Sequence, residues 1–123
     1  MRYKTSSECK LAGVTYHLAP EAVWKEQSDT ATYLPESFDR EGFIHCTDGL
    51  DELMAVANRY YTADTRPFLV LILQVDKIQS PVRYDDLPAI FPHIHGPLNT
   101  NAVIGVIPVQ RDEDGTFVSF SKP

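Results

Sequence analysis

An unbroken run of six apolar residues, Phe68-Leu69-Val70-Leu71-Ile72-Leu73, most strongly limits what this chain can fold into. An amphipathic helix or a half-buried strand would interrupt such a run with polar residues at a regular period. A strand buried on both faces has no such interruption. The run therefore predicts a central strand over 68–75. It is far too short for a membrane helix, which needs about 20 residues.

One long helix is expected directly before this strand. Its apolar residues recur at steps of three and four, the spacing of one helix face: Leu50, Leu53, Met54, Ala57, Tyr60 and Tyr61. Thr47 or Asp48 is expected to cap its first turn. A shorter helix is expected over Glu21–Glu26, because Pro20 is well tolerated where a helix begins. Trp24, Tyr60, Tyr61 and Phe68 are expected in the core.

The other expected elements are strands and loops. Val14–Leu18 alternates with period two, which places Tyr16 and Leu18 on one face and His17 on the other. Pro108 predicts a sheet edge or a bulge in the late strand. The remaining expectations are strands over 42–47, 78–84, 91–95, 103–109 and 116–120, a hairpin turn over 112–115, and loops over 28–40 and 85–92. This order predicts an α+β domain rather than a doubly wound sheet.

Length and charge narrow the possible functions. A chain of 123 residues suits a single domain, 1–123, in which residues 1–13 are expected to be a loose arm. Seventeen acidic residues against eleven basic ones give a net charge of −6, which argues against non-specific nucleic-acid binding. No stretch resembles a signal peptide, so a cytoplasmic location is expected. Cys9 and Cys46 are then expected to be free thiols, and Cys46 a core residue.

All four histidines lie in or beside predicted strands, where alternation decides which way they point. His45 shares a face with Phe43 and Thr47, and its neighbour Cys46 points the opposite way. His93 and His95 point in the same direction. We therefore expect each imidazole, including that of His17, to leave the core face and to collect in one cleft.

A metal site is an alternative use of these imidazoles. The His93-x-His95 pair can present two nitrogens to one ion, and His17 or His45 could supply a third ligand. No carboxylate at a motif spacing and no cysteine pair supports such a site, so no metal is expected. Tyr33 lies in the polar loop, where it could stack on a ligand or cover the edge of the core.

Several stretches together resemble one family, the domain-of-unknown-function family 952. The resemblance runs from about residue 16 to about residue 108, and the core of the domain is expected over 14–109. The matching stretches are Tyr16-His17-Leu18, Trp24, Glu41 with Gly42-Phe43-Ile44-His45-Cys46-Thr47, Ala57-Asn58-Arg59-Tyr60-Tyr61, and Phe91-Pro92-His93-Ile94-His95-Gly96-Pro97-Leu98.

The resemblance implies the fold of ADP-ribosyltransferases, a split and strongly bent β-sheet with a few helices and a cleft for a dinucleotide. It implies NAD or an ADP-ribose-type nucleotide as the ligand. His17 would bind a ribose on the adenosine side, with Tyr33 and His95 as further ligand-binding candidates. His45 and Thr47 would line the reacting end as catalytic candidates. The glutamate common on a late strand of that superfamily is missing, and His93 is the nearest polar candidate to assist catalysis in its place.

These expectations leave three functional hypotheses. The first is a transferase-like enzyme that acts on NAD or an ADP-ribose-related nucleotide in a histidine-lined cleft. The second is a non-catalytic nucleotide-binding or sensing module on the same fold, which the missing glutamate motivates. The third is a His-ligated metal enzyme.

Overall fold

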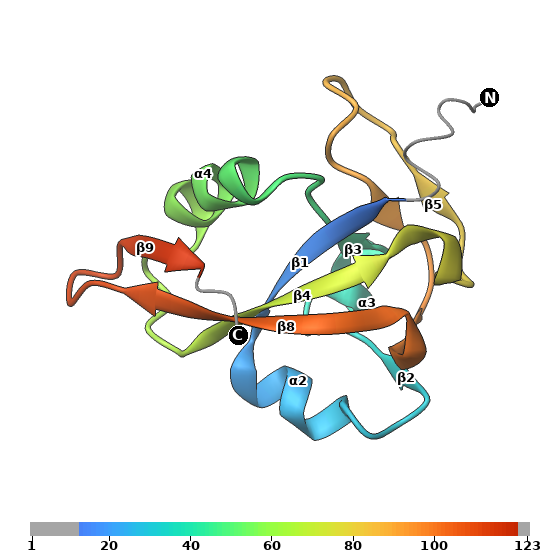
Figure 1. Ribbon diagram of the computed structural model, residues 1–123, viewed down its shortest axis with the longest axis horizontal. Coiled ribbons are helices and arrows are strands. Elements are labelled where there is room, and N and C mark those ends of the chain that lie inside the picture. The colour runs from blue at the N-terminus through green and yellow to red at the C-terminus, as the bar shows by residue number, and fades with distance from the viewer. Residues whose placement is uncertain (1–12, 121–123) are drawn as a thin grey trace.

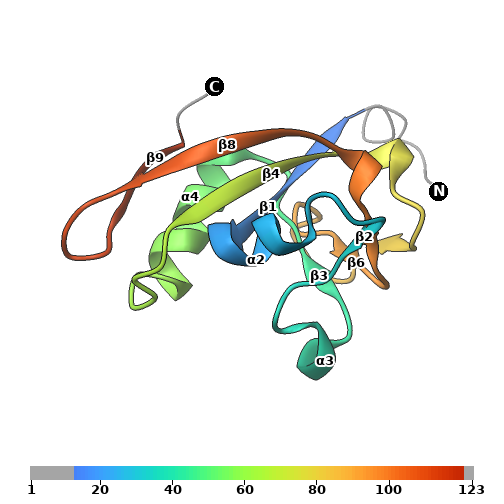
Figure 2. The same ribbon diagram turned by 90° about the horizontal axis from the view of Figure 1, so that it is seen from below.

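A curled, four-stranded antiparallel sheet, about half of a barrel, forms the centre of the molecule (Figures 1 and 2). The computed structural model describes residues 13–120. Apart from Gly13, the expected N-terminal arm lies outside these residues. The strands, in spatial order, are β1 (Val14–Pro20), β4 (Phe68–Gln74), β8 (Val103–Arg111) and β9 (Phe117–Phe120).

Strand β4 is central and is buried on both faces. It pairs with β1 along one edge and with β8 along the other. Val70 and Phe68 belong to the hydrophobic clusters on one face of the sheet, and Leu71 and Leu73 to the cluster on the opposite face. The central strand predicted from the apolar run is therefore confirmed.

Helix α4 (Leu50–Tyr60) covers one face of the sheet, as its periodicity predicts. Leu53 packs there in a cluster with Val70 of β4 and Ile107 of β8. The expected cap was wrong, because the helix begins after Gly49 and no side chain bonds to its first turn. Tyr60 was also wrongly placed in the core. It lies on the solvent side of the last turn and is 67% exposed.

Helix α2 (Glu21–Gln27) and two small sheets cover the opposite face. One sheet pairs β2 (Thr32–Tyr33) with β7 (Leu98–Asn99). The other has the order β3 (Ile44–His45), β6 (His93–Ile94) and β5 (Val82–Arg83). The three short helices are α3 (Phe38–Glu41), η1 (Val75–Lys77) and η2 (Thr100–Ala102). The segment expected to be a loop over 28–40 therefore contains β2 and most of α3.

The cover on both faces corrects one prediction about β1. Tyr16 and Leu18 do share a face, and they pack on the α4 side. The opposite face was expected to leave the core, yet Thr15, His17 and Ala19 are buried on it. Alternation correctly predicted which side chains of β1 share a face, but it cannot show that short strands distant in the sequence cover the second face.

The hairpin between β8 and β9 follows the sequence prediction. Gly115 occupies the turn with a φ of 95°, a conformation that glycine adopts without strain. Pro108 pairs with Leu69 of β4, whereas β9 pairs with β8 only from Val109 onward. Pro108 thus lies where β8 has a β partner on one side among the described residues, which agrees with the predicted sheet edge.

All strand pairs in the described chain are antiparallel, and the helices lie outside them, so the predicted α+β class is confirmed. Within residues 13–120, no helix has both the length and the apolar character needed to span a membrane.

We expect Leu53→Ala to lower the free energy of unfolding by about 2–5 kcal/mol, because it empties a buried site between α4 and the sheet. Chemical denaturation measures this change. Leu87→Ala makes the same truncation at a residue that is 92% exposed, and we expect it to cost less than about 0.5 kcal/mol. Equal effects of the two variants would contradict the packing described above.

Candidate functional site

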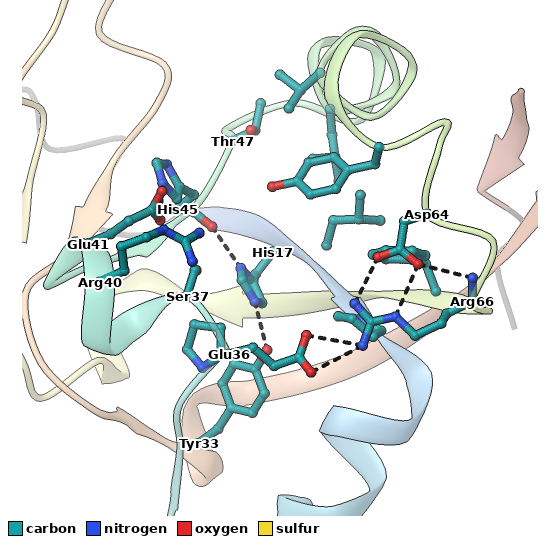
Figure 3. Close-up of a pocket in the computed structure, with 17 residues that line it drawn as sticks. His17, Tyr33, Glu36, Ser37, Arg40, Glu41, His45, Thr47, Asp64 and Arg66 are labelled. Atoms are coloured by element: carbon teal, nitrogen blue, oxygen red, sulfur yellow. Dashed lines mark hydrogen bonds and ion pairs between the residues drawn. The ribbon is translucent and has the colours of Figure 1, made fainter. Parts of the chain in front are cut away.

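Two adjoining hollows form a groove between α4, α3 and strand β3. The first, which we call the polar pocket, has a volume of about 300 Å³, and its lining is drawn in Figure 3. The second, the aromatic pocket, has a volume of about 650 Å³ and is lined by Phe43, Phe91 and His93 among others. Residues that line both hollows mark their junction: Glu41, His45, Thr47, Val56 and Tyr61. Both volumes lie in the range of small-molecule sites.

His17 lies at the back of the polar pocket with both ring nitrogens occupied (Figure 3). Nδ1 is 2.7 Å from the carbonyl oxygen of His45, and Nε2 is 2.9 Å from the hydroxyl of Tyr33. A carbonyl only accepts, so Nδ1 carries the hydrogen. Burial lowers the pKa of His17 from 6.5 to about 4, so the ring is neutral at pH 7 and Nε2 accepts from Tyr33.

Tyr33, whose hydroxyl bonds to His17, is a core residue. It is fully buried on β2, meets Trp24 edge-on at 5.7 Å between ring centroids, and also lines the polar pocket. Burial raises the pKa of its hydroxyl. Of the two roles considered for Tyr33, covering the core edge is therefore the one the structure supports. His17 and Tyr33 were both expected to bind ligand, but the Tyr33 hydroxyl bonds to Nε2 of His17, and Nδ1 of His17 bonds to the carbonyl of His45.

His45 stands at the junction of the two pockets, with its side chain 49% exposed. Its Nε2 donates to Oε1 of Glu41 at 2.8 Å. Glu41 ends helix α3, and Gly42 then reverses the chain in a left-handed conformation with a φ of 81°. The turn brings a carboxylate and an imidazole together four residues apart, although no helix joins them.

Thr47 and Cys46 are neighbours whose side chains were expected to point to opposite faces of the strand. Thr47 lines both pockets, but it is only 3% exposed. Its backbone bonds to Tyr16 of β1, which connects the small sheet to the curled sheet. Cys46 is a buried free thiol, as expected, and burial raises its pKa.

His93 and His95 lie near the aromatic pocket and share one acidic partner. His93 is 8% exposed, and its ring stacks on Phe43 at 4.2 Å between ring centroids. Its Nδ1 and the Nε2 of His95 each lie 3.2 Å from Oδ2 of Asp85. The hydrogen bond from His95, with that from His93, lowers the pKa of Asp85.

The predicted meeting of the imidazoles is therefore correct in part. His17 and His45 line the polar pocket, and His45 and His93 line the aromatic pocket with their ring centroids 5.3 Å apart. His95 lines neither hollow, because it follows β6 and turns toward Asp85. The expectation that every imidazole leaves the core face was wrong for His17 and His93, which are buried.

Two guanidinium groups face the polar pocket from opposite sides (Figure 3). Arg66 pairs with Asp64 at 2.8 Å and with Glu36 at 3.1 Å, so carboxylates surround its charge. Arg40 lies beside His45 and Glu41, and it forms no ion pair with any residue in 13–120. Arg40 is thus the guanidinium with charge available to an anionic ligand.

Sequence reasoning missed Arg40, Glu41 and Asp85 as site residues. Glu41 was part of a matching motif, but its spacing from His45 gave no signal because a turn separates the two. Arg40 and Asp85 lie at the ends of polar segments, where charged residues are ordinarily solvated.

One known protein family matches this chain. The family model of DUF952, described as a protein of unknown function, matches residues 18–106. This is most of the chain, so the chain belongs to the DUF952 family, as the resemblance in its motifs predicts. No curated protein matches the chain.

Solved structures of one bacterial protein have the same fold. The crystal structure of protein CC0527 from Caulobacter crescentus has a TM-score of 0.72 at 18% identity, covering 85% of this chain and 93% of that chain. A double mutant of CC0527 gives the same values. Its solution structure by NMR has a TM-score of 0.66 at 17% identity, covering 83% of this chain and 89% of that chain. At these identities the likeness extends to the fold alone.

The low pKa of His17 makes stability depend on pH. Between about pH 4 and 6.5 the unfolded chain binds a proton at His17 that the folded chain does not, so stability falls as pH falls through this window. The full loss is about 3 kcal/mol, at 1.36 kcal/mol per pKa unit. Urea unfolding at several pH values measures it.

The matched variant is His17→Asn, whose side-chain amide can still donate to the carbonyl of His45 but does not titrate. We expect a shallower dependence of stability on pH in this window. The same slope in the variant and the original chain would show that His17 is not the responsible group.

Proposed function

We propose that the groove binds a nucleotide of the ADP-ribose class, with NAD and ADP-ribose as the leading candidates. The observation that carries this proposal is the contrast between its two pockets. Arg40, Glu41 and His45 supply polar groups at the polar pocket, whereas aromatic rings line the other. A nucleotide has the same division, since it joins charged phosphates and ribose hydroxyls to a planar base.

Each half of such a ligand has a suitable partner. The guanidinium of Arg40 can pair with phosphate oxygens by charge-assisted hydrogen bonds. The carboxylate of Glu41 can accept hydrogen bonds from ribose hydroxyls. Phe43 and Phe91 offer ring surface to a base in the aromatic pocket. His17, whose nitrogens are both used within the protein, supports the pocket wall rather than the ligand.

The fold is proposed to be that of ADP-ribosyltransferases, as the family resemblance implies. Two features support this assignment: the strong curl of the main sheet, and the backbone bridge between Tyr16 and Thr47 that continues β1 toward a separate small sheet. The groove lies beside this split. A ligand there would have its reacting end near His45 and Thr47.

Glu41 supplies a carboxylate close to the proposed reacting end of the ligand. Strands β8 and β9 carry no glutamate, but Glu41 reaches the junction of the pockets from the end of α3. In a transfer from NAD, the bond between C1′ and nicotinamide breaks, its electron pair leaves with nicotinamide, and a nucleophile adds to C1′ with loss of its proton. A carboxylate beside C1′ stabilises the positive charge that develops on the ribose.

We expect ADP-ribose to bind the original chain, and Arg40→Gln and His45→Ala each to weaken binding by at least about tenfold. A charge-assisted hydrogen bond is worth about 1.5–3 kcal/mol, and 1.4 kcal/mol is tenfold in affinity. Isothermal titration calorimetry measures this. Arg59→Gln, at an exposed arginine of α4 outside both pockets, should leave the affinity unchanged. No binding by the original chain would refute the proposal.

Incubation with NAD and chromatography of the products separates an enzyme from a binding module. We expect release of nicotinamide that is at least about 100-fold slower in Glu41→Gln, the scale of losing one transition-state contact. The alternative is a sensing module, which the lack of a late-strand glutamate favours. In that case, ligand at 100 times its dissociation constant stabilises the fold by roughly 2.7 kcal/mol without turnover.

A further inference from the structure

Asp85, His93 and His95 form a cluster beside β6, next to the aromatic pocket that His93 lines. One carboxylate oxygen, Oδ2 of Asp85, lies 3.2 Å from Nδ1 of His93 and 3.2 Å from Nε2 of His95. All three donor atoms lie within 4.8 Å of one another. The cluster contains two imidazoles and one carboxylate, each of which offers one ligand atom to the group.

The spacing of these atoms suits a transition-metal ion. Metal–nitrogen and metal–oxygen bonds in proteins are about 2.0–2.2 Å long. Two donors on one ion, at tetrahedral or octahedral angles, are therefore about 3.0–3.5 Å apart. Both distances from Asp85 fall in this range. An ion would need the two imidazole nitrogens to approach within the same range.

The fold holds the cluster in place without blocking it. The ring of His93 is fixed between strands by its stacking on Phe43, and its residue pairs with both β3 and β5. The backbone N–H of His95 donates to the carbonyl of Pro81 at 2.8 Å. The side chains of His95 and Asp85 are 27% and 42% exposed, so an ion and its water ligands can reach the site.

We propose that Asp85, His93 and His95 bind one divalent transition-metal ion, with Zn²⁺ as the leading candidate. Two imidazoles and one carboxylate suit zinc, iron, cobalt or nickel, whereas magnesium and calcium take oxygen ligands. The third ligand is Asp85 and neither His17 nor His45, the two considered from the sequence. Asp85 and His95 line neither pocket, whereas His93 also lines the aromatic pocket, so the site adjoins the proposed nucleotide groove but does not rest on the proposed function.

Without an ion, the same contacts are hydrogen bonds from the two imidazoles to one carboxylate. His93 would then carry its hydrogen on Nδ1 and His95 on Nε2. An imidazole binds a metal through a nitrogen lone pair, so the hydrogen of each ring would move from the binding nitrogen to the other ring nitrogen. Metal binding to this cluster therefore changes the tautomer of both rings without net proton release.

Titration of the full chain, freed of metal by chelator, with Zn²⁺ tests the proposal by calorimetry. We expect one ion per chain. Asp85→Asn and His95→Gln should each weaken binding at least about tenfold, because even loss of a supporting contact to a metal ligand costs 10- to 100-fold. Both changes lie at accessible side chains, and thermal unfolding checks that the variants fold.

Two control variants locate the ion. Asp86→Asn removes the adjacent exposed carboxylate, which is not part of the cluster, and should leave Zn²⁺ affinity unchanged. His45→Gln should also leave it unchanged. Co²⁺ should give a visible absorption band that is absent in Asp85→Asn. No Zn²⁺ binding, equal losses in Asp85→Asn and Asp86→Asn, or loss in His45→Gln would each overturn the proposal.

Discussion

The neutral imidazole of His17 joins the three sheets of the molecule. It lies on β1 of the curled sheet, donates to the backbone of β3 in one small sheet, and accepts from Tyr33 on β2 in the other. Each such hydrogen bond contributes about 0.5–1.5 kcal/mol when made, and an orphaned buried partner costs about 1–3 kcal/mol. The position of the polar pocket, which opens beside this ring, depends on these contacts.

The elements that sequence reasoning located are those with enough residues to show a pattern. Strand β4 is seven residues long and apolar on both faces, and α4 repeats its apolar positions over three turns. The small sheets consist of two-residue strands, which are too short for any periodicity. The burial of His17 could not be predicted for the same reason, since those short strands cover it.

The candidate site, like the fold, was predicted only in part from the sequence. Three imidazoles from separate segments do line the two adjoining pockets, with His45 alone lining both, because strand alternation and family motifs both mark them. The acidic partners were not predicted. Glu41 reaches His45 through a glycine turn, and Asp85 reaches His93 through strand pairing, so neither contact leaves a spacing in the sequence. The ring of Phe43 contacts the imidazoles of His45, His93 and His95 and orders this side of the groove.

The ion pairs of Arg66 have a consequence for which ligands the polar pocket can admit. Asp64 and Glu36 together outweigh the single charge of Arg66, and Glu41 lies beside Arg40 in the lining (Figure 3). Counting only the carboxylates and guanidinium groups, the lining carries one more negative than positive charge. A strongly anionic polyphosphate would meet repulsion there, whereas a sugar diphosphate with fewer charges would meet less. Selection among nucleotides would thus rest on charge number as well as on shape.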